Sequence, residues 1–224
     1  MADNNVTLIR FVLDETGSMH DIRNDTIGGF NSYIEKLRAS TDRFEFTLSK
    51  FDSNHHTVVC EGVAIERVPF LTPDNYRPGA STPLVEVATQ AIEDMAKKTS
   101  ERGPEAQVQV VIQTDGFENS SRPEYTFERL SGLIKEKEDA GWLFIFLGAG
   151  IDAFDQGQKM GFRPARTMQY DRNMSRRMFE SLSASSIRYS RSRVPEAAQW
   201  SMEERQVTGG HEMPEAKETK QKEQ

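Results

Sequence analysis

The sequence predicts a doubly wound, Rossmann-like α/β fold: a mostly parallel sheet with one antiparallel edge strand and helices on both faces. Three nearly continuous apolar runs support this prediction, "VTLIRFVL" (6–13), "VQVVIQTD" (108–115) and "WLFIFLGAG" (142–150). Each run is too short for a typical helix, and its lack of polar alternation is typical of a strand buried on both faces. Segments with helical spacing of apolar residues lie between these strands, in the order of a doubly wound sheet.

The first half of the chain supplies one helix and the antiparallel edge. Helical spacing predicts an amphipathic helix over about 22–39. Its apolar face consists of Ile27, Phe30, Ile34 and Leu37. The segment 43–52 alternates between polar and apolar residues, and a second candidate strand lies within 56–68, after the polar turn "SNHH". Two strands joined by a short turn predict an antiparallel hairpin.

The second half begins with a Pro/Gly-rich loop, "LTPDNYRPGASTP". A helix is predicted to begin at Pro83, with Thr82 as its N-cap. The elements predicted next are the strand at 108–115, a helix at about 127–140, the strand at 142–150, a short helix within 152–162, a strand at 165–171 and a helix from 173 to about 191.

We predict one domain over residues 1–193 and a charged tail over residues 194–224. The tail has little apolar periodicity and ends in a charged run. Such a segment buries too little apolar surface to offset its conformational entropy, so we predict that it is mostly disordered. Trp200 and Met202 are its candidate docking residues.

Composition narrows the class of protein. The chain has 224 residues, 36% of them hydrophobic, and its net charge of −7 argues against bulk nucleic-acid binding. Cys60 is the single cysteine, so no internal disulfide forms, and a lone thiol fits a reducing compartment. The first residues show no signal-peptide pattern, and no run approaches 18 apolar residues. We therefore expect a cytoplasmic protein without a membrane span.

Polar side chains with oxygen donors follow the predicted strands. Asp14, Thr16 and Ser18 come directly after the first strand, Thr82 lies on the loop "RPGASTPL", and Asp115 ends a central strand in "QTDGFEN". Ligands of open α/β sheets bind outside the carboxyl ends of the strands, where these residues should converge. Two carboxylates and three hydroxyls, with no thiolate or imidazole, suit Mg²⁺ or Mn²⁺ rather than zinc.

The segments "DETGS", "GASTPL" and "TDGFEN", in that order and spacing, resemble the metal-ion-dependent adhesion site (MIDAS) of von Willebrand factor A-type (vWA) domains. The family pattern is Asp-x-Ser-x-Ser, a later Thr and a later Asp that is often followed by Gly. The chain matches it at Asp14, Ser18, Thr82 and Asp115 and departs at Thr16, where Ser is usual. The resemblance covers roughly residues 5–190, because the order of strands and helices also fits.

The resemblance implies a function as well as a fold. Thr16 and Ser18 would hold the metal through their hydroxyls, Thr82 would approach it directly or through water, and Asp14 and Asp115 would act mostly through water or hydrogen bonds. The open metal position would accept an acidic residue of a partner protein. The implied protein is a non-catalytic interaction module in a bacterial or phage-infected cell, and a ring-shaped ATPase is one partner class. A metal-dependent hydrolase and a structural domain with an empty site are the alternatives.

Several features have simpler explanations. "DETGS" could be a helix cap and turn, and Asn119 is expected to orient its loop. His20 is expected to face solvent, and His55 and His56 are expected at the tip of the hairpin. "GAGIDA" (148–153), with Asp171 about 20 residues on, has the outline of a dinucleotide fingerprint, but this unit is the last of the sheet and its glycines fit a tight exit from the strand.

The segment 163–193 is strongly basic. Its arginines are Arg163, Arg166, Arg172, Arg176, Arg177, Arg188, Arg191 and Arg193. A solvated helix face and a docking face for an acidic partner or nucleic acid both remain open for it.

Overall fold

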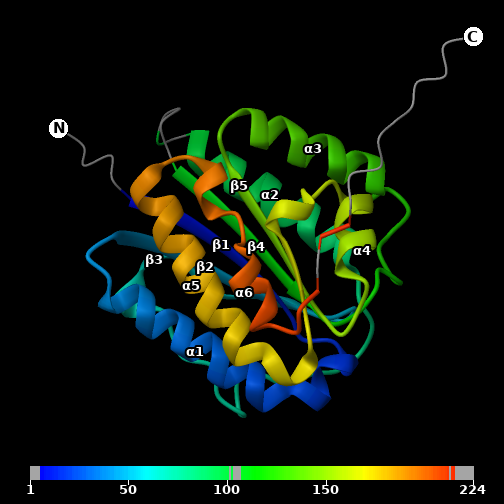
Figure 1. Ribbon diagram of the computed structural model, residues 1–224. Helices are drawn as coiled ribbons and strands as arrows, with labels where there is room; N and C mark the ends of the chain where they lie inside the picture. Colours follow the sequence, from blue (N-terminus) through cyan, green and yellow to red (C-terminus); the bar gives the residue numbers. More distant parts are fainter. Residues whose placement is uncertain (1–5, 101, 103–106, 212, 215–224) are drawn as a thin grey trace, which may run out of the picture.

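The computed structural model describes residues 6–100, 102, 107–211 and 213–214. Within these residues it contains one six-stranded sheet with the strand order β3-β2-β1-β4-β5-β6 (Figure 1). The strands are β1 Val6–Asp14, β2 Arg43–Phe51, β3 His56–Ala64, β4 Gln107–Thr114, β5 Leu143–Ala149 and β6 Thr167–Tyr170. Neighbours are parallel except at the β3 edge, where β3 runs antiparallel to β2. The prediction of a Rossmann-like α/β fold with one antiparallel edge strand is confirmed.

Helices cover both faces of the sheet (Figure 1). The main helices are α1 Arg23–Ala39, α2 Leu84–Ser100, α3 Phe127–Asp139, α4 Ala153–Met160 and α5 Ser175–Ser192. Alternate side chains of β1 divide the core: Phe11 packs with α1 and α5, whereas Val12 packs with α2 and α3. This division explains why the strand is apolar at nearly every position, since a residue on either face of it is buried.

An aromatic cluster fixes the α1–α5 layer on the sheet. Its rings are those of Phe11, Phe30, Tyr33, Phe46 and Phe179. The rings of Phe11 and Phe30 meet edge to face, with centroids 5.5 Å apart. Gly29 makes the approach of α5 feasible, because a Cβ there would lie 2.4 Å from Phe179 Cδ2.

The register of the central strands brings their carboxyl ends to one edge of the sheet. Leu13 of β1 pairs with Gln113 of β4, so Asp14 and Thr114 end their strands side by side. The residues that follow, including Asp115, leave the sheet at the same edge. The fold thus places two of the predicted site segments next to each other before any side-chain contact is considered.

The prediction of a disordered tail is wrong for residues 194–211. This part contains a 3₁₀ turn, Pro195–Ala198, and a short helix, α6 Met202–Gln206. Trp200 is 6% exposed, and the buried Arg205 guanidinium donates hydrogen bonds to the carbonyls of Thr167 (2.9 Å) and Pro164 (3.1 Å). Single anchors of this kind have no periodicity for sequence patterns to detect. Most of the tail after residue 211 lies outside the described residues.

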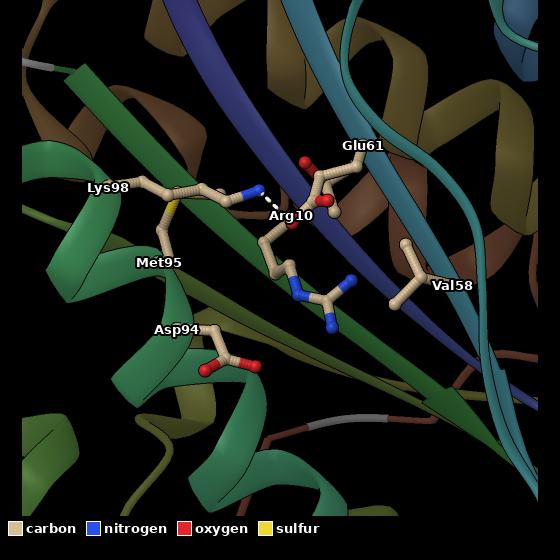
Figure 2. Close-up of a pocket in the computed structure, with 7 residues that line it drawn as sticks. Arg10, Val58, Glu61, Asp94, Met95 and Lys98 are labelled. Carbon is tan, nitrogen blue, oxygen red and sulfur yellow. Dashed lines mark hydrogen bonds and ion pairs between the residues drawn. The ribbon is translucent and has the colours of Figure 1, made fainter.

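A buried charge lies between β1 and α2, away from the predicted site (Figure 2). Arg10 is 3% exposed, and its Nη1 makes no hydrogen bond to any described residue. It borders a cavity of about 20 Å³, large enough for about one water molecule, where Lys98 pairs with Glu61. Burial lowers the pKa of Arg10 to about 10. The carboxylate of Asp94 lines the same cavity.

We expect Arg10→Met to stabilise the fold by about 1–3 kcal/mol, because an apolar side chain of similar length removes the desolvation cost of the guanidinium. Urea unfolding should show a higher midpoint with an unchanged m-value. A variant less stable than the wild type would mean that bound water compensates the charge fully.

Candidate metal centre

The first and third predicted segments are joined at the edge of the sheet. The hydroxyl of Ser18 donates a hydrogen bond of 2.5 Å to Asp115 Oδ1. Thr16 Oγ1 lies 3.3 Å from Ser18 Oγ, so three side-chain oxygens from two distant parts of the chain form one group. Thr16 and Asp115 are buried, whereas Ser18 is exposed and lies on the solvent side of the group.

Asp14 lies beneath this group and organises it. Its side chain is fully buried; Oδ1 accepts the Thr16 N–H at 2.7 Å, and Oδ2 accepts the Thr114 hydroxyl at 2.5 Å. The hydroxyl of Tyr76 donates to the Asp14 carbonyl at 2.6 Å. Burial raises the pKa of Asp14 to about 6, although the hydrogen bonds from Thr114 and Thr16 oppose the shift.

Thr82 approaches from the second segment. A Cβ built on Gly116 would lie 2.9 Å from Thr82 Oγ1 and 3.5 Å from Ser18 Oγ, so both hydroxyls border the same point in front of Gly116. The two loops are tied together: Thr82 N–H donates to Asn119 Oδ1 (2.9 Å), and Asn119 N–H donates to the Thr82 carbonyl (3.1 Å). This pair of bonds confirms the expected loop-orienting role of Asn119.

The predicted N-cap role of Thr82 is wrong. The first turn of α2 is capped by side chains from the loop after β4: Val85 N–H donates to Glu118 Oε2 (2.7 Å), and Glu86 N–H donates to Ser121 Oγ (2.9 Å). A local Thr-Pro pattern cannot reveal a cap that comes from a segment more than thirty residues away. The hydroxyl of Thr82 is therefore not needed as a cap for α2.

Backbone hydrogen bonds join the first loop to the second. Gly79 N–H donates to the Glu15 carbonyl at 2.8 Å, and Gly17 N–H donates to the Ala80 carbonyl at 3.1 Å. Lys50 Nζ lies 2.8 Å from Glu15 Oε1 and neutralises that carboxylate. These contacts fix the loop that carries Thr82 against the loop that carries Ser18.

Arg172 is a residue of the site that the sequence did not single out. Its Nη2 lies 3.1 Å from Asp115 Oδ2, a buried oxygen that makes no hydrogen bond with the described residues, and its Nη1 lies 3.6 Å from Asp21 Oδ2. A Cβ on Gly150, where φ is +63°, would lie 3.0 Å from Arg172 Cγ and Nε. The "GAG" sequence could have pointed to this contact, since its second glycine leaves the space that the arginine stem fills.

Other arginines of the basic segment are paired within the chain. Arg163 pairs with Glu138, Arg166 with Glu138 and Glu196, Arg176 and Arg177 with Glu180, Arg188 with Glu204, and Arg191 with Asp42. These ion pairs favour a surface network over a free basic face.

The predicted histidines lie at the periphery. The side chain of His20 is 76% exposed, with Nδ1 4.0 Å from Asp21 Oδ1. His55 is 75% exposed at the hairpin, and His56 is the exposed first residue of β3.

The donor set fits a hard cation. It consists of carboxylate and hydroxyl oxygens, the ligands that Mg²⁺ and Mn²⁺ prefer. Among the described residues, no three His, Cys, Asp or Glu side chains form a metal-binding group, so a cation here would depend on the hydroxyls. Burial raises the pKa of Asp115, while the Ser18 hydrogen bond and Arg172 act in the opposite direction. Because Gly116 has no side chain, space remains beside the hydroxyls of Thr82 and Ser18.

The raised pKa of Asp14 predicts a pH dependence of stability in metal-free protein. The folded state holds this proton more tightly than the unfolded state, so the stabilisation is fully present below about pH 3.8 and is lost as the pH rises through about 6. Between pH 7 and pH 5, the wild type should gain about 1 kcal/mol of unfolding free energy relative to Asp14→Asn. Urea unfolding measures this free energy at each pH. An equal change in the wild type and in Asp14→Asn between pH 7 and pH 5 would contradict the prediction.

Comparisons with known proteins support the fold alone. No protein-family model matches the chain, and no curated protein matches it. Among solved structures, the chain is similar to proximal thread matrix protein 1 (PTMP1) from the mussel byssus, with a TM-score of 0.56 and 14% sequence identity. The match covers 80% of this chain and 46% of that one, so the chain spans about half of the mussel protein's length. Among the described residues, no helix combines the length and apolar composition that crossing a membrane requires.

Proposed function

We propose that the chain is a vWA-type interaction module that binds Mg²⁺, or Mn²⁺, at a MIDAS and recruits an acidic segment of a partner protein. Asp14, Thr16, Ser18, Thr82 and Asp115 would hold the ion directly or through water. The observation that carries the proposal is the 2.5 Å hydrogen bond between Ser18 and Asp115. It joins two residues 97 positions apart at the carboxyl ends of the strands.

The surroundings of the site support this proposal. Thr82 reaches the same point beside Ser18, and its hydroxyl is not used for capping. Arg172 is 40% exposed and lies beside Asp115 and Asp21, so an incoming carboxylate would meet its guanidinium at the side of the site. A bound cation would add to this attraction, and the partner's carboxylate would complete its ligand set.

The cellular setting is part of the proposal and rests on the resemblance. A cytoplasmic role in a bacterial or phage-infected cell fits the single thiol of Cys60. A ring-shaped ATPase is the partner class that the resemblance suggests. The proposed role is binding rather than catalysis.

Partner capture tests the proposal. Wild-type protein and His20→Ala, an exposed control variant two residues from the motif, should retain a partner from native lysate in Mg²⁺ and release it in EDTA. Ser18→Ala should retain none, because the exposed hydroxyl is lost without disturbing the core. A partner that is held equally in EDTA and by Ser18→Ala would contradict a metal-bridged interaction.

A further inference from the structure

Phe117 is an exposed aromatic residue directly beside the site. It is 52% exposed and lies between Gly116, which borders the Ser18 and Thr82 hydroxyls, and Glu118. A single exposed apolar side chain is normal on a protein surface. The position of Phe117 is unusual because the backbone on both sides of it is held by the interior of the protein.

The buried side-chain amide of Gln156 makes hydrogen bonds to the residues on both sides of Phe117. Gln156 of α4 is 3% exposed; its Nε2 donates to the Gly116 carbonyl (3.0 Å), and its Oε1 accepts the Glu118 N–H (3.3 Å). Gly116 N–H also donates to Thr114 Oγ1 at 3.0 Å. The residue before Phe117 and the residue after it are therefore both fixed.

The carboxylate of Glu118 anchors the same loop further. It accepts hydrogen bonds from Val85 N–H (2.7 Å), Ser120 N–H (2.9 Å) and Ser121 N–H (2.7 Å). The loop thus holds the backbone of Phe117 in a fixed place, so binding a partner would cost little ordering of the backbone. Rigid aromatic anchors of this kind dominate the affinity of many protein interfaces.

We propose that Phe117 is the apolar anchor of the docking surface, and that the partner segment carries an apolar side chain within three residues of its acidic residue. This inference rests on the proposed function, since it assumes that the acidic residue binds at the site. The spacing follows from the chain: the Phe117 Cα lies within about 9 Å of Ser18 Oγ, given 3.8 Å between consecutive Cα atoms. An extended peptide covers that span in one to three residues.

The charges favour an acidic occupant over a wholly apolar one. Arg172 pairs with Asp115 and Asp21 at the site, and 40% of its side chain remains exposed. An apolar peptide would leave this guanidinium without a new partner, whereas an acidic residue next to an apolar one would satisfy both features of the rim.

A peptide-display selection in Mg²⁺ tests the inference. The library presents random peptides of about twelve residues to the wild type, to Phe117→Ala and to Phe70→Ala. Phe70 is a matched control because it is also partly exposed (37%) but packs beneath Arg38 near the far end of α1. The wild type and Phe70→Ala should select an acidic residue with an apolar residue within three positions of it. Phe117→Ala should keep the acidic residue and lose the apolar preference.

The affinities of a selected peptide then measure the coupling between Phe117 and the apolar residue of the peptide. A selected peptide should bind Phe117→Ala at least about tenfold more weakly than the wild type, and replacing its apolar residue by glycine should abolish that difference. The Mg²⁺-dependent rise in melting temperature should be equal in all three proteins, which shows that the site is intact.

The outcomes separate the two proposals. If Phe117→Ala selects the same apolar neighbour or binds the selected peptide with wild-type affinity, the inference is overturned and the proposed function stands. The same holds if the wild type selects acidic peptides in Mg²⁺ with no apolar preference. If the wild type selects no acidic residue, or if EDTA leaves binding unchanged, the proposed function fails and the inference fails with it.

Discussion

Gly116→Ala is expected to weaken Mg²⁺ binding by roughly a tenfold to hundredfold factor although it removes none of the proposed ligand residues. Its methyl group would lie 2.9 Å from Thr82 Oγ1 and 3.5 Å from Ser18 Oγ, in the space where the two hydroxyls converge. Overpacking of this kind costs about 1–3 kcal/mol, which corresponds to roughly a tenfold to hundredfold loss of affinity. Isothermal calorimetry with Mg²⁺ measures the loss directly.

Gly79→Ala is the matched control for this substitution. Gly79 lies on the loop that carries Thr82, and a Cβ there would meet nothing within 4 Å. The variant keeps the N–H that donates to the Glu15 carbonyl, so it should bind Mg²⁺ like the wild type. Wild-type affinity in Gly116→Ala would show that the metal does not lie in front of Gly116.

Arg172→Gln is expected to bind Mg²⁺ about three- to tenfold more tightly than the wild type. The substitution removes a positive charge 3.1 Å from Asp115 Oδ2, and like charges repel the incoming cation. The effect is kept small because the side chain is 40% exposed and solvent screens it. The same variant should lower the stability of metal-free protein by about 1–3 kcal/mol, because the buried Oδ2 loses its partner.

Arg172→Lys separates charge from geometry in this prediction. Lysine keeps the positive charge but not the planar guanidinium, so its Mg²⁺ affinity should stay near the wild-type value. Weaker Mg²⁺ binding by Arg172→Gln would mean that the arginine serves mainly to orient Asp115, and it would contradict the electrostatic account.

The sheet could be predicted because its physics is local. A strand buried on both faces must be apolar at nearly every position, and the run from Val6 to Leu13 shows this directly. The positions of Asp14 and Asp115 followed from the same strands, since parallel strands end at one edge. Helices such as α1 were visible because one face of each is regularly apolar.

Contacts between distant segments could not be predicted in the same way. The cap of α2 comes from Glu118 and Ser121, so the local Thr82–Pro83 signal was misleading. Arg172 was hidden among seven other arginines, and only its place beside Gly150 and Asp115 distinguishes it. The packed part of the tail could not be predicted because Trp200 and Arg205 are isolated anchors without a repeating pattern.

Calorimetric titration of the wild type and Asp115→Asn with Mg²⁺ and Mn²⁺ tests the central claim most directly. We predict one binding site per chain in the wild type, with a rise in melting temperature that depends on metal concentration, and neither effect in Asp115→Asn. No heat and no thermal shift in the wild type at millimolar metal would contradict a metal centre at this edge of the sheet.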